Sequence, residues 1–131
     1  MRQPALFIPR GGGPCFFMDR DPPDAWARHR AFLAGVPLTV PERPRALLVI
    51  SAHLEAPGFP VQRHAAPPLL FDFGGFPPQT YQLTWPAPGA PSLAERVAEL
   101  PGAAGRALAP LRDESVPIIG SGNTCHNRRK P

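Results

Sequence analysis

Residues 46–52 read ALLVISA, and this stretch decides the fold. It is a continuous run of aliphatic and β-branched residues with charge only before it. Apolar runs of this length are typical of a strand that is covered on both faces, as in a parallel sheet. We therefore predict a buried strand over residues 46–52.

Two more apolar runs lie near the two ends of the chain. Ala5–Ile8 is closed by Pro9 and leads into the glycine triplet at 11–13, and Val116–Ile119 leads into GSGN at 120–123. Short apolar runs bounded by glycine or proline indicate buried strands. Each of these strands is expected to end in a glycine-rich loop.

Three helical segments are predicted, over residues 21–35, 91–101 and 105–114. The second begins at Pro91, with Ser92 and Glu95 at the spacing of a capping box, and Pro110 should kink or restart the third. Helices that alternate with buried strands indicate an α/β fold. We predict a single domain, residues 1–131, with a mostly parallel central sheet flanked by helices. Sites in such sheets collect at the carboxyl ends of the strands.

The composition favours an ordered, loop-rich chain. It contains 21 prolines and 12 glycines among 131 residues, yet 43% of the residues are hydrophobic. The net charge is +4, of which Arg128, Arg129 and Lys130 supply three. Three basic residues make few phosphate contacts, so no nucleic-acid partner is expected.

The cysteines and the length of the apolar runs indicate where in the cell the protein is located. Cys15 and Cys125 are the only cysteines and are far apart in sequence, which fits a reducing cytoplasm better than a disulfide framework. No apolar run approaches the roughly 20 residues that span a bilayer. A cytoplasmic protein without a membrane partner is therefore predicted.

A candidate metal site follows the strand at 46–52. His53 comes directly after it, and Glu55 would project from the same face in extended backbone. Imidazole and carboxylate ligands with open positions suit non-haem Fe(II), and zinc accepts the same atoms. The alternative is that His53 hydrogen-bonds a loop carbonyl and Glu55 faces solvent.

A second candidate lies in GSGNTCHN at 120–127, where His126 could act as acid, base or ligand, oriented by the amides of Asn123 and Asn127. Gly120 and Gly122 would permit tight turns there. A phosphate-binding loop is less well supported, because neither GxGxxG nor GKS/T is present. Cys125 is adjacent to His126, and adjacent side chains on extended backbone point apart, so a spectator thiol is expected.

Aromatic residues gather in FDFGGFPPQTYQLTWPAP at 71–88. Phe71, Phe73, Phe76, Tyr81 and Trp85 could wall a pocket for a flat aromatic ligand, or could pin this loop to the core. Both interpretations stay open. His29 and His64 have no arranged neighbours in the sequence and are expected to be surface residues without a role.

Four segments, in this order, resemble the DOPA-dioxygenase type of class III extradiol dioxygenase. They read PALFIPRGGGP (4–14), ALLVISAHLE (46–55), DFGGFPPQTYQLTWPAPGAPSLAERVAEL (72–100) and LRDESVPIIGSGNTCHN (111–127). The resemblance implies an α/β fold and metal-dependent extradiol cleavage of a catechol ring by dioxygen. It implies Fe(II), or Zn(II), held by histidines at strand ends, with His53 as one ligand and His126 as the catalytic histidine that assists proton transfer.

The chain departs from the family pattern at three places. Arg10 stands where the family's glycine-rich motif carries a histidine ligand, and a guanidinium cannot donate to a metal. A family segment with a further histidine and strand is missing near residues 102–106, so the sheet is expected to be shortened. A further C-terminal histidine ligand would follow Pro131.

These departures predict that the chain is impaired or inactive as a catechol dioxygenase. A small aromatic diol and dioxygen remain the partners that the resemblance implies. One alternative is a non-catalytic binding or interaction protein that uses the aromatic loop and an exposed sheet edge. Another is a truncated gene-model product.

Overall fold

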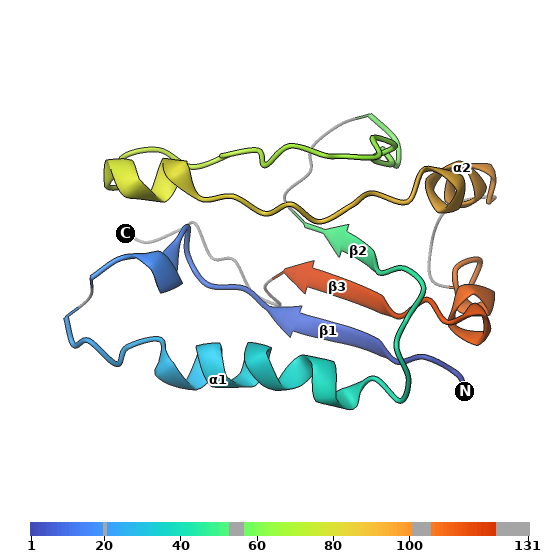
Figure 1. Ribbon diagram of the computed structural model, residues 1–131, viewed down its shortest axis with the longest axis horizontal. Coiled ribbons are helices and arrows are strands. Elements are labelled where there is room, and N and C mark those ends of the chain that lie inside the picture. Colours follow the sequence, from blue (N-terminus) through green and yellow to red (C-terminus); the bar gives the residue numbers. More distant parts are fainter. Residues whose placement is uncertain (20, 53–56, 101–105, 123–131) are drawn as a thin grey trace, which may run out of the picture.

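The computed structural model describes residues 1–19, 21–52, 57–100 and 106–122, and the structural statements below concern these residues (Figure 1). Three strands form one sheet: β1 (Ala5–Pro9), β2 (Leu48–Ser51) and β3 (Ile118–Gly122). Their order is β1-β3-β2, and both pairings are parallel. The predicted α/β fold with a parallel sheet is confirmed.

The central strand β3 includes the glycines that were expected to form a loop. Gly120 pairs with Phe7 of β1, and Gly122 pairs with Pro9, so that prediction is wrong. A Cβ on Gly120 would lie 3.3 Å from Cδ2 of Phe7, and one on Gly122 would lie 3.0 Å from Cβ of Ala52. The glycines therefore leave room for side chains of the neighbouring strands rather than for a turn.

The helices occur close to their predicted positions. They are the α-helices α1 (Ala27–Gly35) and α2 (Pro91–Glu99) and the 3₁₀-helices η1 (Cys15–Phe17), η2 (Val36–Thr39), η3 (Pro78–Gln82) and η4 (Ala109–Glu114). The first helix begins six residues later than predicted, after turns at 22–26. The N-cap of α2 is Ala90, without a side-chain hydrogen bond, so the predicted capping box is wrong. The segment before β3 is the short 3₁₀-helix η4 rather than an α-helix kinked at Pro110.

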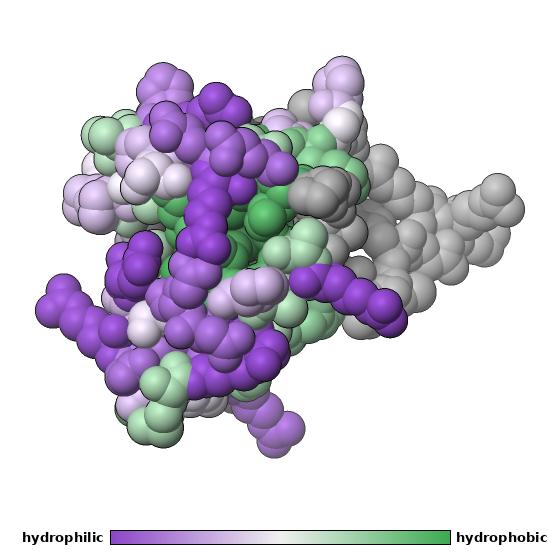
Figure 2. All heavy atoms as spheres, turned by 90° about the vertical axis from the view of Figure 1, so that its right-hand side faces the viewer, coloured by the Kyte–Doolittle hydropathy of each residue, from purple (hydrophilic) through white to green (hydrophobic). Residues whose placement is uncertain are grey.

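The core lies at the amino end of the sheet, where α2 and η4 meet it (Figure 1). Four side chains are buried there and pack together, and Leu48 of β2 and Ile118 of β3 lie against them; the four are Val97, Leu108, Leu111 and Val116. Figure 2 views the molecule from this side and shows hydrophobic residues in the middle with hydrophilic residues around them. This small cluster, rather than the whole sheet, is the packed interior.

An ion pair joins α2 to η4 beside this core. Nη2 of Arg96 lies 2.6 Å from Oε1 of Glu114, and Nη1 donates to the other carboxylate oxygen. These hydrogen bonds lower the pKa of Glu114 below its ordinary value. The pair therefore fixes the carboxyl end of α2 against the segment that leads into β3.

The prediction that ALLVISA is covered on both faces is wrong. Leu48 is half-buried against the core, but Val49, Ile50 and Ser51 are exposed. The reason is the position of the covering helices, because α1 runs alongside β1 and α2 lies at the amino end of the strands (Figure 1). No described helix is long and apolar enough to cross a bilayer.

Candidate functional site

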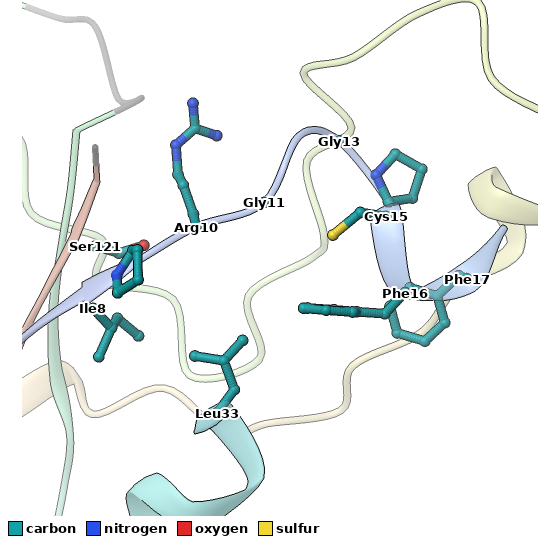
Figure 3. Close-up of a pocket in the computed structure, with 11 residues that line it drawn as sticks. Ile8, Arg10, Gly11, Gly13, Cys15, Phe16, Phe17, Leu33 and Ser121 are labelled. Atoms are coloured by element: carbon teal, nitrogen blue, oxygen red, sulfur yellow. The ribbon is translucent and has the colours of Figure 1, made fainter. Parts of the chain in front are cut away.

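A cavity of about 260 Å³ opens at the carboxyl end of β1, next to β3 (Figure 3). Its apolar wall includes Ile8, Phe16 and Leu33, and its polar groups include Arg10 and Ser121. The carboxyl ends of parallel strands are where ligand sites occur in open α/β sheets. The cavity therefore lies where the sequence predicted a site.

The glycine triplet after β1 shapes one side of this cavity. A Cβ on Gly11 would overlap the sulfur of Cys15, whose side chain is buried. Gly13 has φ +51°, and a Cβ there would lie 2.7 Å from Cζ of Phe76. Glycine is therefore required at position 13 both by the backbone and by the phenyl ring that packs on it.

Arg10 is half-buried at the point where the chain leaves β1. Its side chain extends away from Leu33 and Phe16, on the side where β2 and β3 also end (Figure 3). The guanidinium places a permanent positive charge at the carboxyl end of the sheet, because arginine stays protonated in proteins.

The expectation that His29 has no arranged neighbours is wrong. Its Nε2 lies 3.0 Å from the carbonyl oxygen of Pro9, the last residue of β1. Its ring lies 5.4 Å from that of Phe16 and 5.8 Å from that of Trp26. Arg30, one residue further along α1, donates to the Phe16 carbonyl and sits 5.4 Å from the Phe16 ring centroid. His29 thus helps to hold α1 against the end of β1.

His53, Glu55, Cys125 and His126 lie outside the described residues. The sheet nevertheless shows which segments approach one another, because Ser51 pairs with Ser121 and Pro9 pairs with Gly122. The chain therefore leaves all three strands at the carboxyl end of the sheet, and Arg10 lies at this end. Whether the two histidines converge there stays a prediction.

Within the described ranges, no group of three histidine, cysteine, aspartate or glutamate side chains is placed to hold a metal ion. The cavity lining includes the guanidinium of Arg10, the hydroxyl of Ser121 and the thiol of Cys15. Of these only the thiol is an ordinary ligand for Zn(II), and a single ligand does not make a metal site. The described wall of the cavity therefore does not fit a metal centre.

The aromatic segment packs mainly on itself. Tyr81 lies 5.8 Å from Phe71 and 5.3 Å from Phe73, and Phe73 lies 5.3 Å from Phe76. The Tyr81 hydroxyl donates to the Phe73 carbonyl over 3.4 Å. Trp85 stays 70% exposed, and none of the five aromatic residues lines the cavity. The structure favours a pinned loop over a pocket wall, with Phe76 making the contact to Gly13.

Comparison with known proteins gives several relatives named 4,5-DOPA dioxygenase extradiol. The 4,5-DOPA dioxygenase extradiol of Escherichia coli K12 is 31% identical over 175 aligned positions, which cover 98% of this chain and 62% of the relative. The protein of the same name from Portulaca grandiflora is 41% identical over 147 positions, which cover 74% of the chain and 54% of the relative. The chain belongs to the DOPA type of extradiol dioxygenases. The resemblance stated from the motifs is thereby confirmed.

Within this family the chain is short. It spans about three fifths of the Escherichia coli relative and about half of the Portulaca relative. The dioxygenase tasH of Hapsidospora irregularis, 32% identical over 104 positions, is covered over 30% of its length. The alignment with the Escherichia coli protein has 175 positions although the chain has 131 residues, so the relative has residues without a counterpart here. No protein-family model matches the chain.

Proposed function

We propose that this chain is a DOPA-type extradiol dioxygenase homologue whose ring-cleavage activity is impaired or lost when it acts alone. The activity that we attribute to the family is metal-dependent cleavage of a catechol ring by dioxygen. The observation that carries the proposal is Arg10 on the wall of the cavity at the end of β1. The resemblance implies a histidine ligand at that position.

The guanidinium of Arg10 changes the chemistry at the carboxyl end of the sheet in two ways. It has no lone pair available for a metal, so it removes a ligand rather than replacing one. It also carries a permanent positive charge that repels a divalent cation placed nearby, and half-burial weakens the screening of that repulsion by water. Both effects lower the affinity for a metal at the carboxyl end of the sheet, where β2 ends at Ser51 and β3 ends at Gly122.

The cofactor proposed for the family is Fe(II) or Zn(II), with His53 as a metal ligand and His126 as the catalytic histidine. Metal bound at such a site would supply a place for a small aromatic diol and dioxygen to meet. The described cavity wall does not fit that metal, and we derive no chemical step through it. What the described residues do offer is an apolar wall at Ile8, Phe16 and Leu33 beside one cation.

Oxygen uptake tests this proposal. The purified chain is incubated with Fe(II) without air, desalted, and given DOPA in an oxygen electrode, with the Escherichia coli relative as the positive control. We expect no uptake above that of an iron blank. Turnover comparable with the control would refute the proposed impairment.

Two variants separate the effects of charge and ligation at position 10. Arg10→Gln removes the positive charge without adding a metal ligand, and Arg10→His removes the charge and adds an imidazole. Iron retained after desalting should rise more in Arg10→His than in Arg10→Gln, while oxygen uptake stays at the blank in both. Equal iron retention in the parent chain and both variants would contradict the role given to Arg10.

A second candidate function is a non-catalytic interaction protein. The exposed strand β2 favours it, because Val49 and Ile50 leave about half of their surface open to water. Large apolar side chains on a regular element, when exposed together, mark interaction surfaces.

A further inference from the structure

We propose that a groove at the amino end of the sheet binds a small molecule that has an alkyl chain and a carboxylate, such as a medium-chain fatty acid. The groove lies at the opposite end of the sheet from the cavity at Arg10. This inference goes beyond the proposed function, and its test needs neither metal nor catechol. It rests on the apolar lining of the groove and on the charged groups beside that lining.

The groove forms where the chain passes from η2 to β2. Its lining includes Val36 of η2, Val40 just after η2, and Leu47, the residue before β2. Ile119 of the central strand β3 also lines it, next to its partner Val49, which is 53% exposed. The volume is about 350 Å³, and small-molecule sites in proteins usually measure about 300–1,000 Å³. A small ligand therefore fits this groove.

The lining suits an alkyl chain better than an aromatic ring. Seven of the nine lining residues are apolar, three of them prolines, and none is aromatic. A flat ring gains from stacking on aromatic side chains, and the groove offers none, whereas Phe16 and Phe17 line the cavity at the end of β1. An alkyl chain needs only apolar contact, because its binding is favoured in proportion to the apolar area that leaves water.

The two charged residues of the groove differ in their partners. Oε1 of Glu42 accepts hydrogen bonds from the terminal ammonium of Met1, over 2.9 Å, and from the hydroxyl of Ser115, over 3.2 Å. The side chain of Arg43 is exposed, and no ion pair or hydrogen bond joins it to a described residue. The negative charge is thus offset within the chain, while the guanidinium remains available.

The guanidinium of Arg43 selects the head group of the ligand. Guanidinium and carboxylate are both planar and pair through two parallel hydrogen bonds. An alkylammonium would be repelled by Arg43 and would find the carboxylate of Glu42 already paired. A carboxylate at Arg43, with its alkyl chain along the apolar lining, therefore matches the groove in both charge and polarity.

The test is a titration of the isotope-labelled chain with sodium octanoate below its micelle concentration, followed by amide chemical shifts in NMR. We expect saturable shifts at Val36, Val40, Leu47 and Ile119. Octylammonium, which has the same chain length and the opposite charge, should bind about threefold or more weakly. Butanoate has the same head group and four fewer methylenes. It should bind about tenfold more weakly if half of each methylene is covered.

Two arginine variants test the head group. Arg43→Gln removes the guanidinium at an exposed position, so the fold should be kept. Octanoate should bind about threefold to fivefold more weakly, since an ion pair open to water contributes little, and octylammonium should not lose affinity. Arg63→Gln is the matched control, because it removes the same charge from an exposed residue outside the lining. Its affinity for octanoate should equal that of the parent chain.

Two leucine variants test the position of the alkyl chain. Leu47→Glu places a negative charge in the groove at a residue that is 51% exposed, and should weaken octanoate binding about tenfold. Leu38→Glu makes the same change at a residue that is 88% exposed and outside the lining, and should leave the affinity within about twofold. Shifts that do not saturate, or octylammonium that binds as tightly as octanoate, would overturn the proposal. So would equal losses in Arg43→Gln and Arg63→Gln.

Discussion

Replacing Gly13 by alanine should destabilise the chain strongly, although the change adds a single methyl group. The residue has φ +51°, a conformation that costs a non-glycine residue about 1–2 kcal/mol. The added Cβ would also lie 2.7 Å from Cζ and 2.9 Å from Cε2 of Phe76, and overpacking of this kind costs about 1–3 kcal/mol. The expected total is about 2–5 kcal/mol of unfolding free energy.

Thermal unfolding followed by far-UV circular dichroism measures this effect. For a chain of this size 1 kcal/mol corresponds to roughly 3–5 °C in Tm, so Gly13→Ala should melt about 10 °C below the parent chain. The neighbouring Gly12→Ala is the control, because a Cβ there meets nothing within 4 Å and the φ of Gly12 is not positive. Its Tm should be unchanged or slightly higher, since alanine restricts the unfolded chain.

A double-mutant cycle with Phe76→Ala separates the backbone term from the steric term. If the phenyl ring causes the clash, Gly13→Ala should lower the unfolding free energy by only about 1–2 kcal/mol when Phe76 is absent, which is the backbone term alone. An unchanged penalty in that background would refute the steric contact. Equal Tm values for Gly12→Ala and Gly13→Ala would refute the reasoning as a whole.

Two other predictions concern the core and the ion pair beside it. Leu111→Ala, at a side chain that is 1% exposed, should cost about 2–5 kcal/mol in urea unfolding, whereas Leu38→Ala on the surface should cost little. Because Arg96 lowers the pKa of Glu114, the pair stabilises the fold above the ordinary carboxyl pKa of 4.5, and this stabilisation is lost as pH falls through the lowered pKa. Tm measured against pH should therefore fall less steeply in acid for Glu114→Gln than for the parent chain, and high salt should reduce the difference.

The elements that could be predicted from the sequence are those whose signals are local. The strand at Ala5 ends where Pro9 removes a backbone donor, and the structure ends β1 at that residue. The apolar stripe of α2 faces the core as expected, with Val97 buried and Leu93 and Leu100 packed against the same cluster. In both cases neighbours in sequence contain the information that fixes the element.

The predictions that were wrong depended on neighbours distant in sequence. Gly120 and Gly122 read as loop residues, but β3 lies between two strands, and Phe7 of β1 occupies the space that a side chain on the central strand would need. The exposure of Val49 depends on which elements cover β2, and no local pattern carries that information. His29 likewise contacts Pro9, twenty residues earlier in the chain.

The sequence predicts the position of the candidate site in the fold better than it predicts which side chains form it. The strand order β1-β3-β2 makes the first and last strands neighbours, so the pairing of Pro9 with Gly122 brings Arg10 beside the point where the chain leaves β3. Ser51, paired with Ser121, ends β2 at the same edge. The guanidinium at position 10 therefore lies at the same end of the sheet as Ser51 and Gly122, although more than forty residues separate it from either in sequence. Only the pairing of strands that are distant in sequence brings these positions together, which is why no local pattern could predict it.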